Sequence, residues 1–572
     1  MKRVMYMMAF AVGLIFFQSC VEAENVPLDN TSLIPAPYHL TGKSGSPFIL
    51  DESTTITYSD ASLQEVAHLL SGHLSKETGL PLKVENTPSA AKSKSIHLKV
   101  APAINALEPL PQPIGISAKD GNPKDEFYTL SVSSNKIEIA STAIEGVYRG
   151  ISSLRQIVNG STKDANSFQI VSREMIDGPK FAWRGISFDV SRCFFDMHEV
   201  KQMIDMLALY KMNVLHWHLT DNQGWRVEIK KYPKLTEIGS QIPNGNRKGG
   251  YFTQEQYKEI IQYAADRFIT VVPEIDMPGH TAAVFASYPE LKNAVNLQNI
   301  KFNIPGQALG ALDPDDENTM GFVEDVLTEL AAMTPGSYLH IGGDETFGMP
   351  EDKFIMFIDK VRPMVHKLGK KMVGWQETSR ASIGSGDLIQ HWIYLNTEQA
   401  FEENDNLSSM LSPEFIEILK STFAEAAHDV ERALGKNAQI IMSPSGFVYL
   451  DHSYKETSTD PNQQAEADRL GMPAYPKQTV EEMFNWNPIT FNPSIKPENI
   501  AGVECAIWCE TIESFSDLQF LVLPRLSGVA EKAWSDNGTG DWNEYRVRLG
   551  SQAPLWQRFG WNYFKSSLVD WK

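Results

Sequence analysis

The feature that most constrains the fold is a series of eight apolar segments after Phe181, each of which ends in polar or aromatic residues. In chain order they are GISFDVSR, NVLHWHLTD, ITVVPEIDMPGH, YLHIGGDE, MVGWQE, LIQHWI, QIIMSPS and IAGVECAIWCE. Most are followed by a segment with helical periodicity, as where Val200, Met203, Ile204 and Leu207 share one face. Eight strand–helix units predict an α/β protein with a (β/α)8 TIM barrel over residues 180–540, whose active site lies at the carboxyl ends of the strands.

Some segments depart from the alternation of strands and helices. After the fifth strand, TSRASIGSG is too short and too rich in Gly and Ser for a full helix. The segment 396–437 is long for a connection and contains a predicted helix from Pro413 to Leu434, so we interpret it as an insertion. The polar stretch 454–478 is predicted to be a surface loop near the site. Residues 541–572 are predicted to be a C-terminal tail, helical at first, that packs on the barrel.

Residues 26–176 are predicted to form a small α+β accessory domain. TTITYS has the pattern of a strand, and residues 62–78 have that of an amphipathic helix ending at Gly79. FYTLSVSSNKIEIAS indicates two strands around a Ser-Asn turn, and AIEGVYRGISSLRQIV indicates a second helix. This region carries no cluster of reactive side chains, so we expect the chemistry to reside in the barrel.

The first residues, 1–23, are typical of an export signal. Lys2 and Arg3 precede an apolar run that is too short to span a bilayer, which takes roughly 20 apolar residues. The run ends in FFQSC, which resembles a bacterial lipoprotein site with lipidation at Cys20; the alternative is ordinary cleavage after Ala23. Both interpretations predict an exported protein in the periplasm or at the cell surface. The lipoprotein interpretation adds a lipid anchor, which is the only membrane attachment we expect. The remaining Cys193, Cys505 and Cys509 are interpreted as buried thiols rather than as a disulfide framework.

The net charge argues against a nucleic-acid partner, and the chain has no plausible phosphate-binding loop. The chain has 71 acidic and 51 basic residues, a net charge of −20, which argues against nucleic acid because nucleic-acid binding usually requires a basic face. HIGGDE contains two glycines but lacks the spacing and the Lys of a phosphate-binding loop.

The predicted strand ends carry mainly carboxylates and Trp rings. The residues at these ends are Arg192, His218, Asp221, Glu274, Asp276, His280, Asp344, Glu345, Trp375, Gln376, Glu377, Trp392, Trp508 and Glu510. Aromatic rings suit the apolar C–H faces of a sugar and carboxylates suit its hydroxyl groups, so this set favours a carbohydrate site. A divalent metal held by His218, Asp221, Asp276 and His280 is the alternative; we expect no metal and no cofactor.

Asp344 and Glu345 are adjacent at the end of the fourth strand. On a regular strand two neighbouring side chains point to opposite faces. Both can enter one pocket only if the strand end bends. Gly342 and Gly343 allow such a bend at a low cost in conformational energy. A carboxylic acid and a second group near the anomeric carbon are what glycoside hydrolysis requires.

HIGGDE resembles the signature of family-20 glycoside hydrolases, the β-N-acetylhexosaminidases. WRGISFDVSR, MNVLHWHLTDNQGWR, VVPEIDMPGH, VGWQE, SPSGFVYLD and GVECAIWCE also resemble blocks of that family, in the family's order. The accessory region is similar to its N-terminal domain, so the resemblance covers nearly everything after the signal segment.

The resemblance implies a substrate-assisted reaction. Glu345 is expected to act as general acid and then as general base, while Asp344 orients the substrate's own 2-acetamido group. The carbonyl oxygen of that group attacks the anomeric carbon, which gives a cyclic oxazolinium intermediate and retained configuration. This substrate is a glycan with a terminal β-linked GlcNAc or GalNAc.

The resemblance also implies roles for other residues. Asp221 and His280 are expected to form a relay to Glu345, and Asn222 stands where the family usually has a second Asp. The expected substrate-binding residues are Arg184, Trp375, Trp392, Tyr449, Asp451, Trp508 and Glu510. Arg184, Asp451 and Glu510 would hold hydroxyl groups, Tyr449 would bind the acetamido carbonyl, and the three Trp would wall the pocket.

Five functional hypotheses follow. The leading one is an exo-acting enzyme, because Asp451 and Glu510 match residues that close the pocket behind a terminal sugar. A 6-sulfo-GlcNAc-specific hexosaminidase and a lacto-N-biosidase are alternatives of the same family. A non-catalytic glycan-binding lipoprotein and a metallohydrolase are alternatives of other classes; an intact Asp344–Glu345 pair disfavours the former.

Overall fold

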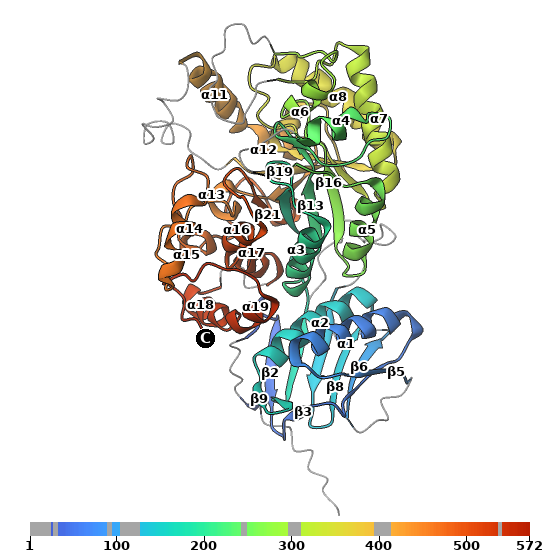
Figure 1. Cartoon of the computed structure of the whole chain (residues 1–572), viewed down its shortest axis with the longest axis vertical. Coiled ribbons are helices and arrows are strands. Elements are labelled where there is room, and N and C mark those ends of the chain that lie inside the picture. The colour runs from blue at the N-terminus through green and yellow to red at the C-terminus, as the bar shows by residue number, and fades with distance from the viewer. Residues whose placement is uncertain are drawn as a thin grey trace, which may run out of the picture.

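The computed structural model describes residues 25–26, 32–87, 94–102, 126–241, 247, 249–295, 310–393, 413–535 and 540–572. They form a barrel surrounded by helices and, below it in Figure 1, a smaller domain of sheet and helices. Cys20 and the rest of the predicted signal segment lie outside the described residues, as do residues 396–412 of the predicted insertion. In the part of the chain that is described, no helix is long and apolar enough to cross a membrane.

Eight parallel strands close into a barrel, which confirms the prediction from the eight apolar segments. They are, in order around the barrel, β12 (Trp183–Asp189), β13 (Val214–His218), β16 (Thr270–Glu274), β17 (Tyr338–His340), β18 (Lys371–Trp375), β19 (Leu388–His391), β20 (Gln439–Met442) and β21 (Ile500–Ile507).

The interior of the barrel is filled in layers. Toward the amino-terminal ends of the strands, one residue from each strand contributes to an apolar cluster: Trp183, Val214, Val272, Tyr338, Val373, Leu388, Ile441 and Ala501. Side chains two positions further along a strand point the same way, and on five strands these are His216, Glu274, His340, Trp375 and Gln390. Glu504 of β21, three positions beyond Ala501, joins this mainly polar layer through hydrogen bonds with His216 and Gln390. The barrel is therefore plugged by apolar packing below and by a buried polar layer directly beneath its mouth.

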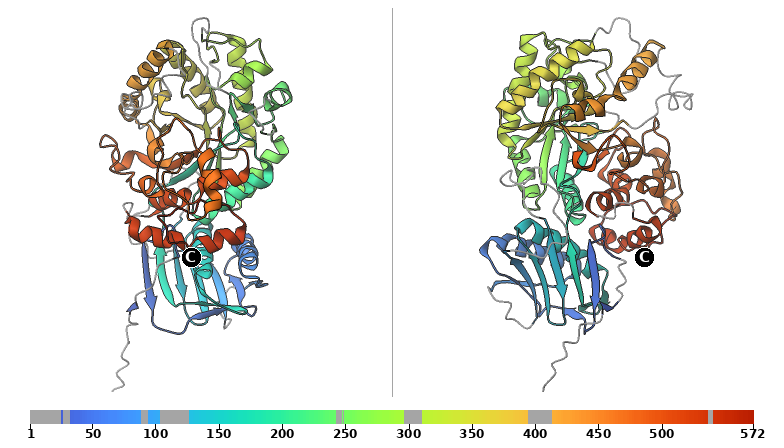
Figure 2. Two further views of the ribbon diagram at one scale, coloured as in Figure 1. Left: turned by 60° about the vertical axis from the view of Figure 1, so that its left-hand side comes forward. Right: turned by 180° about the vertical axis from the view of Figure 1, so that it is seen from behind.

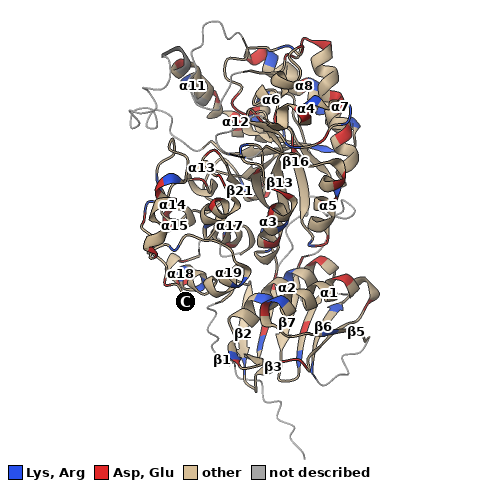
Figure 3. Cartoon of the chain, in the orientation of Figure 1, with Lys and Arg blue, Asp and Glu red and all other residues tan. Residues whose placement is uncertain are grey.

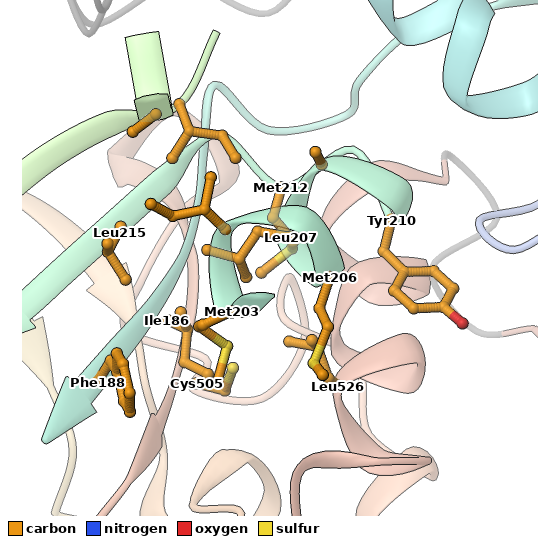
Figure 4. Close-up of a cluster of buried hydrophobic side chains, with 14 of the residues drawn as sticks. Ile186, Phe188, Met203, Met206, Leu207, Tyr210, Met212, Leu215, Cys505 and Leu526 are labelled. Atoms are coloured by element: carbon orange, nitrogen blue, oxygen red, sulfur yellow. The ribbon is translucent and has the colours of Figure 1, made fainter. Parts of the chain in front are cut away.

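The outward-facing side chains of the strands pack against the surrounding helices. Figure 4 shows Ile186 and Phe188 of β12 beside Met203 and Leu207 of α3 (Met197–Leu209), with Cys505 from β21 in the same cluster. All five are buried. Alternate side chains of the strand therefore pack in two cores, one inside the barrel and one between the barrel and its helices. The buried state of Cys193, Cys505 and Cys509 as free thiols agrees with the sequence interpretation.

Helices and short elements fill the connections. The longer ones are α3, α5 (Gln254–Ala265), α7 (Glu317–Met333), α8 (Glu351–Lys367), α11 (Pro413–Ala426), α12 (Asp429–Gly435), α16 (Phe515–Val522), α17 (Arg525–Trp534), α18 (Trp542–Gly550) and α19 (Ala553–Phe559). The shorter ones are β14 (Thr220–Asp221), β15 (Gly224–Trp225), α4 (Lys234–Glu237), η2 (Gly239–Gln241), α6 (Ala282–Ser287), η4 (Gln376–Arg380), α13 (Ser445–Val448), η5 (Pro461–Gln463), α14 (Gln464–Arg469), α15 (Val480–Phe484) and η6 (Pro497–Asn499). Figure 3 shows acidic residues along the outer helix α7.

Two details of these connections bear on the predictions. The connection after β18 holds only the short η4, as its Gly- and Ser-rich sequence predicts. The helix predicted from Pro413 to Leu434 is two helices, because α11 ends at Ala426 and α12 begins at Asp429. Buried Asp429 accepts two hydrogen bonds from Arg380 at 3.0 Å, which fixes the start of α12 against η4.

The accessory domain has an eight-stranded sheet in the order β1-β2-β11-β7-β8-β6-β4-β5 and a three-stranded sheet in the order β3-β10-β9. The strands are β1 (Asn25–Val26), β2 (His39–Lys43), β3 (Phe48–Leu50), β4 (Thr55–Tyr58), β5 (Lys83–Asn86), β6 (Ser95–Val100), β7 (Tyr128–Val132), β8 (Lys136–Ser141), β9 (Thr162–Asp164), β10 (Ser167–Ile170) and β11 (Arg173–Asp177). Its helical elements are η1 (Ala61–Leu63), α1 (Gln64–Thr78) and α2 (Ile144–Asn159), and Figure 2 shows both α-helices on the face toward the barrel.

Helix α2 lies between the accessory sheet and the barrel. Gly146 and Gly150 allow it to approach the sheet closely, because a Cβ atom at Gly150 would lie 2.5 Å from Ile139. On its other side Ser152 donates to the carbonyl of Ala208 at 2.8 Å, and Arg149 donates to the carbonyl of Phe268 at 2.8 Å. These carbonyls precede β13 and β16, so the accessory domain contacts the barrel at the end opposite its mouth.

Candidate active site

The predicted catalytic pair, Asp344 and Glu345, lies at a sharp bend after β17. Gly342 and Gly343 have φ values of +70° and +100°, and Glu345 itself has a φ of +49°. A Cβ atom at Gly342 would lie 1.7 Å from Oδ1 of Asp276, so only glycine fits there. The bend that the two glycines predict is present, and it turns Asp344 and Glu345 toward the same histidine. His280 Nε2 lies 3.7 Å from Asp344 Oδ2 and 3.6 Å from Glu345 Oε2.

A chain of side chains leads from this histidine into the barrel. His280 Nδ1 lies 3.2 Å from Asp221 Oδ1, and the other oxygen of Asp221 lies 3.1 Å from His218 Nε2. Asp221 sits on the small β-hairpin that follows β13, and His280 follows the cis proline Pro278 after β16. Asp221 and His280 are thus in contact with each other and next to Glu345, as the relay hypothesis requires.

The arginine at the mouth is Arg192, not Arg184. Arg184 lies near the amino-terminal end of β12, where it is fully buried and donates to the carbonyl oxygens of Phe181 and Lys211 and to Glu126. The expectation that Arg184 binds sugar hydroxyl groups is therefore wrong. Active sites of such barrels lie at the carboxyl ends of the strands, and Arg184 comes before the strand's apolar run. This position was already visible in the sequence.

Arg192 follows the carboxyl end of the same strand. Its guanidinium lies 2.8 Å from Asp221 Oδ2, 3.8 Å from Glu510 Oε1 and 5.2 Å from the centre of the Trp508 ring. It therefore links Asp221 of the predicted relay, a predicted hydroxyl-binding carboxylate and one of the predicted Trp walls.

Four aromatic rings form a wall beside the catalytic pair. Trp375 has its ring centre 5.8 Å from that of Trp508 and 6.5 Å from that of Trp392. Tyr449 lies nearly parallel to Trp392 at 6.3 Å and at 5.8 Å from Trp508. The three Trp rings come from the ends of β18, β19 and β21, and Tyr449 follows the short helix α13 after β20. The structure thus brings together Trp375, Trp392, Tyr449 and Trp508 as one enclosure.

Two further carboxylates and a second tyrosine complete the mouth. Asp451 is buried, and neither of its carboxyl oxygens has a hydrogen-bonding side chain among the described residues. Burial and the nearby Glu510 raise its pKa well above the usual range. A buried carboxyl group without side-chain partners is the kind of group that a ligand hydroxyl satisfies. Tyr475, whose ring centre is 6.1 Å from that of Tyr449, was missed by the sequence reasoning.

Burial controls the protonation of the catalytic pair. It raises the pKa of Glu345 above the usual value, although the nearby His280 and Arg192 oppose this increase. Burial and the neighbouring carboxyl group of Asp276 raise the pKa of Asp344 well above its usual range. Because a general acid must hold its proton at the working pH, the environment of Glu345 suits that role.

The relay carries alternating charges. Burial opposes the charged form of His280, yet Asp221 raises the pKa of this histidine to about 9. The pKa of Asp221 is lowered far below its usual value despite burial, mainly because of Arg192 and His280. At neutral pH an imidazolium therefore stands between the Asp221 carboxylate and the catalytic pair.

Two groups of residues at the mouth could hold a metal ion. The ligand atoms of His218, Asp221 and Asp276 lie within 4.8 Å of one another, and so do those of Asp276, His280 and Asp344. Both nitrogens of His218 and both oxygens of Asp221 already face side-chain partners. A metal in the first group would displace these contacts, and one in the second would compete with the relay.

The barrel, the two carboxyl groups turned into one site and the aromatic enclosure together define a class of protein: a glycoside hydrolase. Comparison with known families gives the same class. Residues 181–537 match the family described as "Glycosyl hydrolase family 20, catalytic domain", and residues 30–172 match "Glycosyl hydrolase family 20, domain 2". The chain belongs to glycosyl hydrolase family 20.

Similar proteins are known by sequence and by structure. A Beta-N-acetylhexosaminidase from Cellulomonas fimi is 33% identical over 545 residues, which cover 95% of this chain and 98% of that protein. The GH20 beta-N-acetylhexosaminidase from Streptomyces coelicolor A3(2) has a TM-score of 0.78 and 34% identity, covering 96% of this chain and all of that one. A mutant Streptomyces plicatus beta-hexosaminidase in complex with its product GlcNAc also has a TM-score of 0.78 and 34% identity, covering 96% of this chain and 99% of that one. These comparisons support β-N-acetylhexosaminidase activity.

Proposed function

We propose that the protein is an exo-acting, retaining β-N-acetylhexosaminidase that releases terminal β-linked GlcNAc or GalNAc by substrate-assisted catalysis. The observation that carries this proposal is the bend after β17, which presents both Asp344 and Glu345 to one site beside four aromatic rings. The relatives' names support the activity, and the geometry of the pair supports the mechanism.

In the first step Glu345 donates its proton to the oxygen of the leaving group. The bond between this oxygen and the anomeric carbon breaks, and the carbonyl oxygen of the 2-acetamido group forms a new bond to that carbon. The product is a cyclic oxazolinium ion with a positive charge beside Asp344. Burial and the neighbouring Asp276 raise the pKa of Asp344 in the empty site, whereas the positive charge of the intermediate lowers it, so the carboxylate is the form that faces the oxazolinium ion. Asp344 then accepts a hydrogen bond from the acetamido N–H.

In the second step Glu345 acts as a base. It removes a proton from a water molecule, whose oxygen attacks the anomeric carbon and opens the oxazolinium ring. The acetamido group is restored, and Glu345 regains its proton for the next cycle. Two displacements at the same carbon leave the product in the β configuration.

The remaining residues position the sugar. Trp375, Trp392 and Trp508 enclose the acetamido methyl group and the sugar face, and Tyr449 donates a hydrogen bond to the acetamido carbonyl. Asp451 and Glu510, with Arg192, bind the hydroxyl groups farthest from the leaving group. This arrangement favours a terminal sugar, because a chain extending from those hydroxyl groups would meet the side chains.

A panel of aryl β-glycosides tests this function. GlcNAc, GalNAc, 6-sulfo-GlcNAc and glucose derivatives are compared, and the configuration of the first product is followed by NMR. We expect hydrolysis of GlcNAc and GalNAc derivatives with retention and no hydrolysis of the glucoside, which lacks the internal nucleophile. Preference for the sulfated sugar would favour the 6-sulfo-specific alternative. Release of a disaccharide from lacto-N-biose substrates would favour a lacto-N-biosidase.

The same assay separates the other classes. A purified protein that binds these glycans without turnover would be a glycan-binding lipoprotein. Loss of activity after treatment with a strong chelator, restored by a divalent metal, would indicate a metallohydrolase.

We also propose that the protein is exported and anchored by a lipid at Cys20, which the FFQSC sequence supports. Expression in a bacterial host with labelled fatty acid tests this proposal. We expect label on the wild-type protein and none on Cys20→Ser. Label-free secretion of wild-type protein that begins after Ala23 would replace the lipoprotein interpretation with ordinary cleavage.

A further inference from the structure

A fully buried carboxylate lies beneath the site and takes no part in the reaction described above. Glu274 is the last residue of β16 and belongs to the polar layer of the barrel interior. Its Oε2 lies 2.5 Å from His218 Nδ1 and 2.9 Å from His216 Nε2. Its Oε1 accepts a hydrogen bond from the indole N–H of Trp375 at 3.0 Å.

Each oxygen of this carboxylate leads to a different part of the active site. From Oε2 the contacts run through His218 to Asp221, then to His280, and so to Glu345. All members of this path up to His280 are at least nine-tenths buried, so no bulk water screens or replaces these contacts.

From Oε1 one contact reaches the aromatic enclosure. Trp375 is almost completely buried, and its ring faces Trp392 and Trp508. Its only indole N–H is directed at Glu274, so this hydrogen bond fixes the rotation of the ring about its side-chain bonds. The orientation of that ring sets the shape of the enclosure.

The charges along the path are consistent with an ionised Glu274. Burial raises its pKa, but the adjacent His218, His340 and His216 reverse this effect and place the pKa well below the usual range. Burial opposes the charged form of His218 as well, yet Glu274 and Asp221 hold the pKa of that histidine well above its usual value. An anion therefore stands at the start of the path, and cations and anions alternate from it toward the catalytic pair.

We infer that Glu274 is a positioning residue that holds the proton relay with one oxygen and the wall of the acetamido pocket with the other, and so ties leaving-group protonation to N-acyl recognition. This inference rests on the proposed function, since it assigns the relay to Glu345 and the enclosure to the acetamido group. Glu274 itself touches no substrate atom.

The variant Glu274→Gln tests the inference. Glutamine has the same shape, but only one of its two terminal atoms accepts hydrogen bonds, and its amide group would direct N–H toward either His218 or Trp375. Either the Trp375 indole loses its acceptor, or His218 must give up its proton on Nδ1 and accept from the amide, which removes the positive charge from the relay. We call the contact with His218 the relay arm and the contact with Trp375 the enclosure arm. Two ratios of kcat/KM report on these contacts. The ratio for substrates with good and poor aryl leaving groups reports on the relay, and the ratio for N-acetyl and N-propionyl glucosaminides reports on the enclosure. We expect at least one ratio to change by roughly tenfold or more, as for an unsatisfied buried donor.

Glu504→Gln is the matched control. Glu504 is equally buried in the same polar layer and accepts from Trp183 at 2.6 Å, His216 at 2.7 Å and Gln390 at 2.9 Å, but it contacts neither the relay nor the enclosure. We expect it to lower the melting temperature while leaving both ratios within about twofold of wild type, because it reaches Glu274 only through His216 and leaves the contacts of Glu274 with His218 and Trp375 in place. Unchanged ratios in Glu274→Gln, with a stability loss like that of Glu504→Gln, would overturn the inference.

Two further measurements keep the test decisive. If Glu274→Gln does not fold, Glu274→Asp keeps the charge but withdraws the carboxylate by one methylene group, and the same two ratios are measured with the same expectation. The wild-type enzyme is assayed first on GlcNAc and glucose derivatives. Equal hydrolysis of both by the wild type would contradict the proposed function, whereas unchanged ratios in the variants alone would contradict only the role of Glu274.

Discussion

Glu345 and Asp344 are neighbours in sequence, yet their environments suit them to different tasks. Burial keeps the Glu345 carboxyl protonated to higher pH, while Asp344 has one oxygen, Oδ1, that is buried without a hydrogen-bond partner among the described residues. The first is suited to giving up a proton and the second to receiving a substrate N–H group. Substitution of each residue should therefore give a different kinetic result.

For Glu345→Gln we expect turnover of substrates with poor leaving groups to fall by roughly 10²- to 10⁴-fold, the usual contribution of a general acid. Substrates with good leaving groups need little protonation and should be affected much less. Steady-state kinetics on a series of aryl glycosides measures this difference, with Glu351→Gln on the exposed start of α8 as the control. An equal loss across the series would remove Glu345 from the acid role.

For Asp344→Asn we expect kcat/KM to fall by roughly 10²- to 10³-fold, as when an electrostatic stabiliser of a charged intermediate is lost. The asparagine side chain has the same size but cannot become the anion that the oxazolinium ion favours. The loss should be similar for good and poor leaving groups, because the step affected is nucleophilic attack. A wild-type rate in this variant would refute the assignment.

His280 gives a prediction about pH. Its imidazolium, which persists to a pKa of about 9, is the first of the charges that lower the pKa of Glu345 against the effect of burial. In His280→Gln this cation is absent, so the pKa of Glu345 should rise. The basic limb of the kcat/KM profile, where Glu345 loses its proton, should move to higher pH. His366→Gln on α8 is the control, and a basic limb that stays in place or moves to lower pH would contradict the assignment.

At the level of elements, η4 holds the loop that carries Trp392. Gln376 accepts hydrogen bonds from the backbone N–H groups of Trp392 and Ile393 at 3.1 and 3.0 Å, and Glu377 accepts from the Trp392 indole at 3.2 Å. Glu377 also faces Asp429 of α12, the helix that follows the predicted insertion. One wall of the enclosure is thus fixed by a short element that the sequence indicated only as a missing helix.

Glu377 should make stability depend on pH. Burial and Asp429, opposed by Arg380, raise its pKa from 4.5 to about 7, so the folded protein keeps a proton that the unfolded chain releases. The free energy of unfolding should therefore fall as pH rises from about 4.5 to 7, by roughly 1–3 kcal/mol. Glu377→Gln does not titrate, so its stability relative to wild type should increase from pH 5 to pH 8. Melting temperatures measure this trend, and a constant difference would contradict it.

The elements of the barrel could be predicted because each strand is an uninterrupted apolar run that ends in polar residues. The bend after β17 could also be predicted, since adjacent glycines before two acids leave few other interpretations. The break between α11 and α12 was not predicted, and the contact that holds the start of α12, between Asp429 and Arg380, joins residues that are distant in sequence. Tyr475 was also missed, as its place next to Tyr449 depends on how the 454–478 loop folds back.

At the scale of the whole molecule, the accessory domain and the mouth lie at opposite ends of the barrel. Arg184 belongs to the contact between the domains: its guanidinium donates to Glu126, which also pairs with Arg149 of α2 at 2.7 Å. The C-terminal helices reinforce this contact, because Arg548 of α18 donates to the carbonyl of Leu33 at 2.8 Å and Gln552 donates to that of Ser32 at 2.7 Å. The described residues of the accessory domain therefore contact the barrel at the end away from the site.

This arrangement predicts opposite results for two arginines in the same segment. Arg184→Met breaks a buried ion pair at the domain contact and should destabilise the fold by roughly 3–5 kcal/mol, while KM of the folded fraction stays within about twofold of wild type. Arg192→Met should instead raise KM at least tenfold, because it removes a cation from the sugar-binding end of the site. Thermal unfolding and steady-state kinetics on both variants decide the matter. A raised KM in Arg184→Met would restore the original assignment.

The claim on which the whole account depends is that the acetamido group of the substrate is the nucleophile. The most direct test measures kcat/KM for aryl glucosaminides whose N-acetyl group carries zero, one, two or three fluorine atoms. Fluorine withdraws electrons from the carbonyl oxygen without greatly changing its size, so we predict a steep and continuous fall in rate along the series. A rate that is independent of fluorination would contradict attack by the acetamido oxygen and, with it, the roles proposed for Asp344 and Glu345.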